Sequence, residues 1–413
     1  MDEITRMAQD ARKASLALMS ATTKQKNDAL KRLSKLLGER KKEIILANAL
    51  DVKAAMSSLK SQAFIDRLRM TPEIIKGMIE SLHQIEKLPD PVGKILEKRT
   101  LPTKMLLTKV SVPLGVIGII YESRPNVTIE AAALCMKSSN ASILRGGRDA
   151  LHSHLFLFEL VSEAFEHSLP YNTVQYIKNP EHAAVDALLK QDKYIDVIIP
   201  RGGHALIENV TKKSRIPVIR HYQGICHVFI DKDADVTMAI KIAVNAKVQR
   251  PATCNAAECF LIHSGAAKDV LPPLAKELAR YNVEIRGCDK TRQIITCKEA
   301  SDKDWDTEFL DLIVAVKIVS SLDEAIGFIN THGSGHSESI VTKNKRAQAI
   351  FTTNVDAAAV YVNASTRFTD GFEFGLGAEI GISTQKLHAR GPMGLGELTS
   401  YKYVVWGFGQ VRQ

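Results

Sequence analysis

The fold is decided by a continuous apolar stretch, VIGIIY at Val116–Tyr121. A strand whose two faces are both buried has this character, and such strands are typical of parallel sheets. A helix-like segment follows at Val127–Ser138, and a second apolar strand follows at Ala141–Leu144. Because strand, helix and strand succeed one another, the stretch predicts a right-handed parallel crossover.

The same alternation continues toward the C-terminus. Strands are expected at Tyr171–Ile177, Tyr194–Ile199, Ile216–Ile219 and His227–Ile230, with helices at Leu151–His167, Ala183–Lys190 and from Arg201-Gly202-Gly203 through Lys212. A further helix at Ala234–Val248 and a strand at Cys259–Ile262 lead into more units of the same kind, which end with a strand at Ala358–Val362. The sequence therefore predicts an α/β protein with a doubly wound parallel sheet and a second α/β domain.

The segments before this alternation differ in style. Met1–Lys87 reads as helical, with Leu30, Leu33 and Leu37 on one face, and LPDP at 88–91 ends it. Ile95–Val112 interleaves polar and apolar residues, which predicts a two-stranded ribbon with a turn near Pro102. Since a lone ribbon is marginally stable, we expect it to pack on a partner, and Tyr401–Trp406 is expected to be a last strand.

Composition narrows the function classes. The chain has 413 residues, and its net charge of +9 is spread along its length. This distribution favours a solvated basic surface, or a bias toward anionic small substrates, over nucleic-acid binding. The six cysteines form no Cys-x-x-Cys pair, so neither a disulfide framework nor a zinc site is expected. The polar N-terminus and the absence of any apolar stretch of about 18 residues predict a cytoplasmic protein that does not enter membranes.

One cysteine has the surroundings of a nucleophile. It lies in VQRPATCNAAE at Val248–Glu258, where Pro251 cannot continue the preceding helix. Cys254 is therefore expected in a tight turn between helix and strand, beside small residues and Arg250, where a substrate could reach its thiol. The alternative is a small buried cysteine without a chemical role.

Glycines and polar residues follow several of the predicted strands. The usual Gly-x-Gly-x-x-Gly fingerprint is absent, but Gly202-Gly203 opens a helix, where free N–H groups favour phosphate. Arg145 and Arg148 flank a glycine pair at another strand end and could bind phosphate. Asn126 follows the first strand, where its amide could donate to an oxyanion or could cap the next helix.

The stretch PLGVIGIIYESRPNV at Pro113–Val127 and the cysteine turn together resemble the aldehyde dehydrogenase superfamily. The resemblance covers nearly the whole chain, and its motifs follow one another in the expected order. It narrows to the γ-glutamyl phosphate reductase family through ILRGG at Ile143–Gly147, KYID at Lys193–Asp196, IPRGG at Ile199–Gly203, QRPATCN at Gln249–Asn255, YVNASTRFTDG at Tyr361–Gly371 and STQKLHARGPMG at Ser383–Gly394.

The resemblance implies an aldehyde dehydrogenase-like α/β fold. It implies a Rossmann-type NADP-binding domain at 1–94 and 113–225, a catalytic domain at 226–385, and a small β oligomerisation element at 95–112 and 396–413. A homo-oligomer, a dimer or higher, and functional coupling to a glutamate 5-kinase follow from the same resemblance.

The resemblance also implies roles for particular residues. Cys254 matches the nucleophile and Asn126 the oxyanion donor, while Gly202 and Gly203 match the helix start near the dinucleotide pyrophosphate. Three further residues match cofactor positions: Arg145 at the adenosine ribose, Arg148 where NAD-preferring relatives carry an acid, and Glu308 at the nicotinamide ribose.

The implied reaction is the NADPH-dependent reduction of L-glutamyl 5-phosphate, with no metal. Arg124, Arg250 and Arg367 are candidates for the substrate's phosphate and carboxylate, although each could instead be a structural ion-pair partner. Oxidising relatives place a glutamate base at the position that matches 221–225, and the sequence HYQGI there has no carboxylate. The alternative is a reductase of the same superfamily that acts on another acyl phosphate or on an acyl-CoA.

Overall fold

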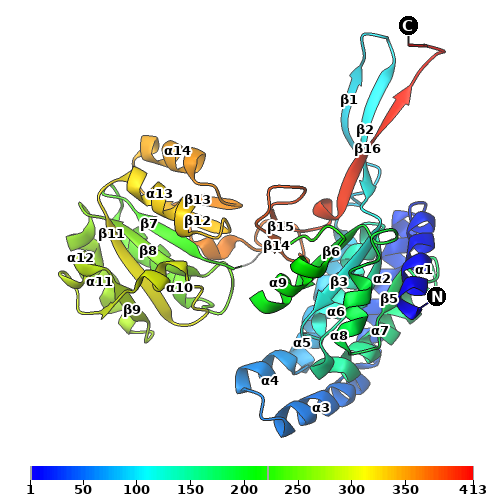
Figure 1. The fold of residues 1–413 in the computed structure, drawn as a ribbon, viewed down its shortest axis with the longest axis horizontal. Helices are drawn as coiled ribbons and strands as arrows, with labels where there is room; N and C mark the ends of the chain where they lie inside the picture. The colour runs from blue at the N-terminus through cyan, green and yellow to red at the C-terminus, as the bar shows by residue number, and fades with distance from the viewer. Residues whose placement is uncertain (1, 221–222, 413) are drawn as a thin grey trace. The chain divides into compact units, whose positions relative to one another are not determined.

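The computed structural model describes residues 2–220 and 223–412, and the chain divides into two compact units. Unit 1 comprises Met1–Arg220, Gly375–Gly381 and Met393–Gln413, and unit 2 comprises His221–Phe374 and Ile382–Pro392. Each unit contains a parallel sheet covered by helices (Figure 1). This arrangement confirms the predicted α/β class.

The sheet of unit 1 is built around the stretch that opened the sequence. Strand β3 (Val116–Tyr121) lies between β4 (Ala141–Arg145) and β6 (Val197–Arg201), and β5 (Val174–Tyr176) pairs with β4. All these pairings are parallel, and every residue of β3 is buried. The crossovers are made by α6 (Asn126–Lys137), η1 (Arg148–Ala150), α7 (Leu151–Phe165) and α8 (His182–Leu188).

The strand expected at Ile216–Ile219 is not formed. The segment makes an isolated parallel bridge between Val218 and Ile198. Pro217 has no N–H to donate to a ladder, and its carbonyl instead accepts from the Ile198 amide at 2.9 Å. The strand prediction is therefore wrong for this segment, apart from that single bridge.

The N-terminal part is helical as expected, and its leucines are buried. Leu30, Leu33 and Leu37 are at most 1% exposed. The second helix begins at a capping box in which the side chains and backbone amides of Thr22 and Gln25 satisfy one another. The helices are α1 (Glu3–Leu18), α2 (Thr23–Glu39), α3 (Lys41–Ser57), α4 (Gln62–Leu68) and α5 (Pro72–Lys87).

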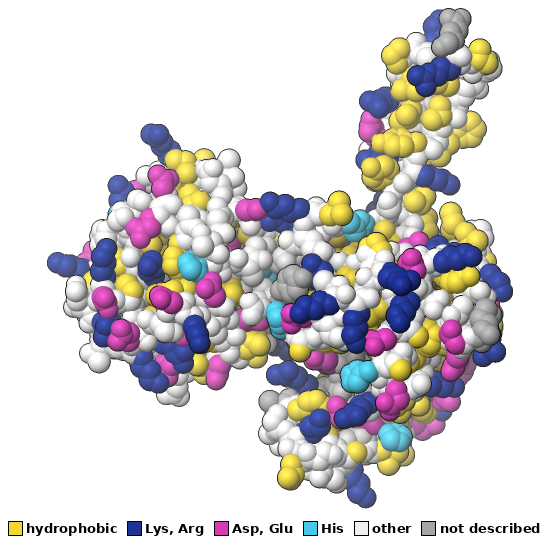
Figure 2. Space-filling view, viewed as in Figure 1, with side chains coloured by type: hydrophobic (Ala, Val, Ile, Leu, Met, Phe, Trp, Pro, Cys, Tyr) yellow, Lys and Arg dark blue, Asp and Glu magenta, His cyan; other side chains and the backbone are white. Residues whose placement is uncertain are grey.

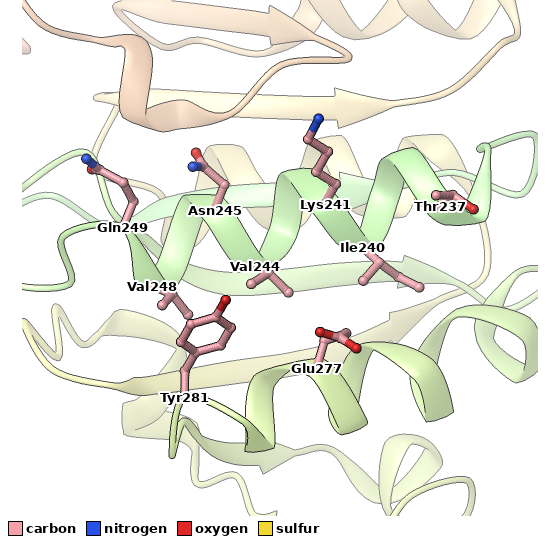
Figure 3. Close-up of a pocket in the computed structure, with 9 residues that line it drawn as sticks. All are labelled: Thr237, Ile240, Lys241, Val244, Asn245, Val248, Gln249, Glu277 and Tyr281. Carbon is pink, nitrogen blue, oxygen red and sulfur yellow. The ribbon is translucent and has the colours of Figure 1, made fainter.

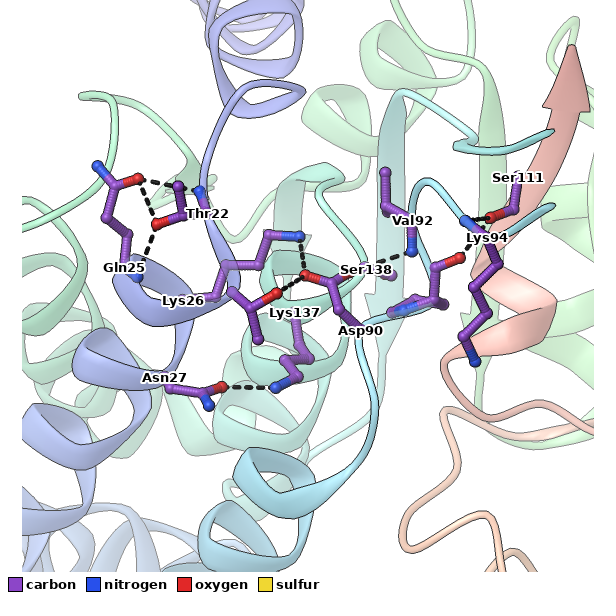
Figure 4. Close-up of polar contacts among 12 residues, drawn as sticks. Thr22, Gln25, Lys26, Asn27, Asp90, Val92, Lys94, Ser111, Lys137 and Ser138 are labelled. Atoms are coloured by element: carbon purple, nitrogen blue, oxygen red, sulfur yellow. Dashed lines mark hydrogen bonds and ion pairs between the residues drawn. The ribbon is translucent and has the colours of Figure 1, made fainter.

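A polar network fixes the LPDP linker between these helices and the ribbon (Figure 4). The Asp90 carboxylate accepts from Lys26 Nζ at 2.7 Å and from the Val92 amide at 3.0 Å. The Ser111 hydroxyl donates to the Pro91 carbonyl and accepts from the Lys94 amide at 3.0 Å. The first strand of the ribbon therefore leaves the helices in a defined direction.

The ribbon expected at 95–112 forms a three-stranded sheet with the last strand of the chain. Strands β1 (Ile95–Thr100) and β2 (Leu106–Pro113) are antiparallel, and β16 (Thr399–Trp406) pairs along the full length of β2. Exposed hydrophobic side chains gather on it, and Figure 2 shows them on the projecting arm. They include Ile95, Leu96, Tyr403 and Trp406, which are between 54% and 62% exposed.

The parallel sheet of unit 2 has the strand order β10-β9-β11-β8-β7-β12-β13. The sequence did not predict the pairing of β9 with β10 or the helix α12, because both lie in a charged segment without an apolar periodicity. The strands are β7 (Cys226–Ile230), β8 (Ala257–His263), β9 (Glu284–Gly287), β10 (Lys298–Glu299), β11 (Ile313–Val319), β12 (Ser337–Val341) and β13 (Ala359–Val362). The helices are α10 (Val236–Val248), α11 (Ala267–Ala279), α12 (Asp289–Arg292), α13 (Leu322–His332) and α14 (Lys345–Asn354).

The apolar stripe of α10 lies on a different face from the one that packs most deeply. Ala239, Ala243 and Ala246 are fully buried, whereas Ile240, Val244 and Val248 are half-buried. The latter line an open groove of about 530 Å³ with Tyr281 of the neighbouring segment (Figure 3). Small residues let this helix approach the sheet closely, so periodicity identified the helix but not its deepest face.

Within residues 2–220 and 223–412, no helix is both long and apolar enough to span a bilayer. The same residues contain no cluster of three or more His, Cys, Asp or Glu side chains placed to hold a metal ion.

Candidate active site

Cys254 lies in a turn between the end of α10 and the start of β8. The side chain is half-buried, whereas Cys226 and Cys259 are at most 1% exposed. The Thr253 hydroxyl donates to the Arg250 carbonyl at 2.8 Å, and the Ala256 amide donates to the Thr253 carbonyl at 2.9 Å. These bonds hold the turn in which the sequence predicted the thiol.

A glycine two residues before β7 packs against this turn. A Cβ at Gly224 would lie 2.0 Å from the Cys254 carbonyl oxygen and 2.5 Å from its Cα, so no other residue fits without moving the turn. The Cys226 thiol donates to the same carbonyl at 3.2 Å. Because burial raises the pKa of Cys226 well above its usual value, it stays a hydrogen-bond donor. Sequence reasoning missed Gly224, which lies 30 positions before Cys254.

The segment after β13 anchors the other side of the turn. The Asn255 side chain donates to the Thr369 carbonyl at 2.8 Å, and the Thr366 hydroxyl donates to the Asn255 carbonyl at 2.7 Å. Arg367, in η3 (Thr366–Phe368), donates to the Gln249 side chain at 2.8 Å. The cysteine turn and this segment therefore form one hydrogen-bonded assembly.

Two of the three arginines proposed for substrate lie at this assembly. Arg250 is exposed and Arg367 is half-buried. Burial lowers the pKa of Arg367, and the positive charge of Arg250 lowers it further. The two guanidinium groups therefore lie within electrostatic range of each other. Arg367 also lines a polar cavity of about 300 Å³ with Asn245, Gln249 and Asp370. Two cations beside a half-buried thiol favour an anionic ligand.

Glu308 lies half-buried between η2 (Asp302–Asp306) and β11. Burial, and to a lesser degree the charge of Glu308, raises the pKa of Glu258 to about 8. Glu308 is thus near the strand that follows the cysteine turn, within the same unit.

The remaining candidates belong to unit 1. Asn126 is the first residue of α6, and its amide donates to Glu130 Oε1 at 3.1 Å along the helix. The cap position is taken by Pro125, so Asn126 is not a side-chain N-cap. Burial raises the pKa of Glu130. Arg124 is exposed two residues earlier, in the same loop after β3.

The Gly202-Gly203 pair opens α9 (His204–Lys213), so the helix begins where the sequence predicted. The Gly203 amide donates to Glu122 Oε1 at 2.7 Å. A Cβ at Gly202 would lie 2.7 Å from the same carboxyl group. The first amide of the helix start is therefore satisfied by a carboxylate from the loop after β3.

Arg145 and Arg148 are placed very differently. Arg145 is 7% exposed and donates to the carbonyls of Gly146 and Pro180. Arg148 is exposed at the start of η1. Of the pair, Arg148 is therefore the guanidinium that faces solvent, while Arg145 braces the loop.

In the stretch that matches the missing glutamate base, His221 and Tyr222 lie outside the described residues. Gln223 is half-buried, next to Gly224.

Comparisons with known proteins agree along the whole chain. A model of the Aldehyde dehydrogenase family matches residues 1–294. The chain is 51% identical over 414 residues to the γ-glutamyl phosphate reductase of Carboxydothermus hydrogenoformans, and 49% identical to that of Clostridium kluyveri. These alignments cover 100% of this chain and at least 99% of each relative.

The fold agrees equally well with solved structures. The crystal structure of γ-glutamyl phosphate reductase from Thermotoga maritima matches with a TM-score of 0.98 and 46% identity, covering 100% of both chains. An acetylating aldehyde dehydrogenase from Geobacillus thermoglucosidasius, 16% identical with a TM-score of 0.70 over 100% of this chain and 98% of that one, shares the fold alone.

Proposed function

Because the chain belongs to the γ-glutamyl phosphate reductase family of the aldehyde dehydrogenases, we propose that it reduces L-glutamyl 5-phosphate to L-glutamate 5-semialdehyde with NADPH in L-proline biosynthesis. The observation that carries the proposal is Cys254, half-buried in a turn that Gly224 and the 365–369 segment hold in place. The family resemblance extends through this turn and through both units.

The first chemical step belongs to the cysteine. The Cys254 sulfur, as thiolate, attacks the acyl carbon, and the C–O bond to phosphate breaks with its electron pair leaving on phosphate. Phosphate departs as an anion, so no strong general acid is required. Two of the proposed substrate arginines, Arg250 and Arg367, would attract the phosphate, and Asn126 is the proposed donor to the tetrahedral oxyanion.

The second step reduces the thioester on Cys254. When bound, NADPH supplies the hydride that this step requires. The carbon–sulfur bond then breaks, the aldehyde leaves, and the sulfur regains its electron pair as thiolate. The chain's part is to keep the acyl group on a sulfur that water does not attack, which is consistent with a 221–225 stretch without a carboxylate.

Residues of unit 1 fit the phosphates of such a cofactor. The α9 helix start already holds one anionic oxygen, that of Glu122, at the Gly203 amide. Arg148 is exposed at a strand end, where a 2′-phosphate could form charge-assisted bonds. Glu308 is the proposed contact of the nicotinamide ribose.

We also propose that the protein acts as a homo-oligomer, with coupling to a glutamate 5-kinase that makes its labile substrate. The ribbon exposes Tyr403 and Trp406 on a sheet that the described residues of the chain do not cover. A second copy is the simplest cover. Light scattering at micromolar concentration tests this, and a monomer would contradict it.

The function is tested by a coupled assay with glutamate, ATP, a glutamate 5-kinase and NADPH. We expect NADPH oxidation with one phosphate released from the acyl phosphate per turnover, and none with Cys254→Ser. Cys259→Ser is the matched control because its thiol is buried and removed from the turn. Thiol release from an acyl-CoA, with no turnover of the acyl phosphate, would favour the alternative reductase.

A further inference from the structure

A polar cavity of about 370 Å³ lies inside unit 2, apart from Cys254 in sequence. It is lined by the Gly333–Gly335 turn after α13, by Glu338 of β12, by Asp356 before β13, and by Thr384, Lys386 and Arg390 of the hairpin between β14 (Ile382–Ser383) and β15 (Gly391–Pro392). Charged groups of both signs therefore converge on one small space.

The negative end of the cavity is Glu338, which is 1% exposed. Its Oε2 accepts from the His227 amide at 2.7 Å and lies 3.0 Å from His227 Nδ1. Its Oε1 has no hydrogen-bond partner among the described residues. A Cβ at Gly333 would come within 2.9 Å of this buried oxygen, so a side chain at that position would crowd Oε1 at the edge of the cavity that Glu338 lines.

The positive end is formed by the hairpin. Arg390 and Lys386 both pair with the Asp356 carboxylate, at 2.7 and 2.5 Å, so two cations share one anion. Arg390 Nε is buried and has no hydrogen-bond partner among the described residues. The cavity thus holds an unsatisfied acceptor and an unsatisfied cationic donor, each of which carries a desolvation cost while unpaired.

We propose that this cavity binds the zwitterionic head of an α-amino acid, with its ammonium at Glu338 and its carboxylate at Arg390 and Lys386. A free phosphate would meet Glu338 and Asp356, and a simple cation would meet Arg390 and Lys386, so neither matches both ends. The head of an α-amino acid supplies a donor and an acceptor on neighbouring atoms. An ammonium at Oε1 also stabilises the charged form of Glu338, which burial disfavours.

The cavity is joined to the nucleophile's turn by hydrogen bonds. The Ile225 amide donates to the Ser334 hydroxyl at 2.9 Å, and the Ser334 amide donates back to the Ile225 carbonyl at 3.3 Å. Ile225 directly follows Gly224, which packs on Cys254. If the proposed function holds, its substrate carries such a head, and this connection favours the substrate itself over a separate effector.

The test compares L-glutamate with glutarate, which lacks the α-ammonium, by calorimetric titration of the intact protein. We expect the wild type to prefer L-glutamate by about tenfold or more, and Glu338→Gln to abolish the preference. Arg390→Met should weaken both ligands, while Arg346→Gln, which removes an exposed arginine of α14, should change neither.

Binding is measured without turnover, so its failure is distinct from failure of the proposed reaction. Equal affinity of the wild type for both ligands, or unchanged L-glutamate affinity in both cavity variants, would show a cavity filled only by water. If Glu338→Gln does not fold, the test rests on Arg390→Met: weaker L-glutamate binding supports the proposal, and unchanged binding contradicts it. A matching rise in KM for the acyl phosphate at constant kcat identifies the substrate's own head; loss of inhibition by an amino acid at constant KM identifies a separate effector.

Discussion

Lys247 Nζ donates to Glu258 Oε2 at 2.5 Å, and neither side chain is more than 1% exposed. Lys247 is in the last turn of α10 and Glu258 is the second residue of β8, so the pair joins the two elements that Cys254 connects. Burial lowers the pKa of Lys247 and raises that of Glu258, and each partner opposes the shift of the other. The two elements that flank Cys254 are therefore joined by a buried hydrogen bond in which each partner favours the charged form of the other.

Removal of one partner of the pair should lower the free energy of unfolding much more than removal of both partners. Lys247→Met leaves a carboxyl group buried without its cation, and we expect a loss of about 3–5 kcal/mol in the free energy of unfolding. The double variant Lys247→Met, Glu258→Gln should recover most of this. Urea unfolding followed by circular dichroism measures both, and a double variant as unstable as the single one would contradict this account.

Gly224 should be indispensable for catalysis because of its contact with Cys254. Gly224→Ala places a methyl group 2.0 Å from the Cys254 carbonyl oxygen, so the turn must shift. A displaced nucleophile should lower kcat by about a hundredfold. Gly327→Ala is the matched control, since no atom lies within 4 Å of its added methyl and a helical alanine stabilises by about 1 kcal/mol. Equal activity of the two variants would contradict the role of the contact.

The sequence predicted elements well wherever local pattern decides them, and β3 and the cysteine turn are the clearest cases. It did not predict partners that are remote in the chain. Gly224 is visible only as a glycine before a strand, and its need for a missing Cβ appears when β7 packs beside the turn. No local pattern singles out Glu338 or Arg390, because the cavity between them arises from tertiary packing.

Cofactor preference should depend on Arg148 rather than on Arg145. Arg148→Glu puts a negative charge where the 2′-phosphate is proposed to lie, so the ratio of kcat/KM for NADPH to that for NADH should fall at least tenfold with little change in kcat. Arg145→Met should lower stability instead, because its donors to the Gly146 and Pro180 carbonyls are lost. Equal use of both cofactors by the wild type would refute the assignment.

Acid should destabilise unit 1 through His154. Burial, and then the charge of Arg145, lowers the pKa of His154 from 6.5 to about 3. The unfolded chain therefore takes up the proton first, so the stability contributed by the neutral ring is complete above pH 6.5 and is lost as the pH falls toward 3. The slope should be about 1.4 kcal/mol per pH unit within that window. Urea unfolding at a series of pH values measures the free energy of unfolding at each pH. The free energy of unfolding should change less steeply with pH in His154→Gln than in the exposed control His167→Gln. Identical pH dependences in the two variants would contradict this account.

The absence of a carboxylate at 221–225 should decide what the thioester on Cys254 reacts with. An oxidising relative must activate water to release its product, and that activation needs a base. Without one, oxidation of L-glutamate 5-semialdehyde by NADP⁺ should stop at the acyl-enzyme unless an anion attacks it. We therefore expect the oxidation rate to rise with phosphate concentration from a very low value, and arsenate to replace phosphate. Gln223→Glu introduces a carboxylate beside Gly224 and should raise the phosphate-independent oxidation rate. The comparison variant is Gln249→Glu, which places a carboxylate on the other side of the cysteine turn. A wild-type rate that stays high without phosphate or arsenate would mean that another group activates water, and reduction of an acyl phosphate would then lose its mechanistic basis.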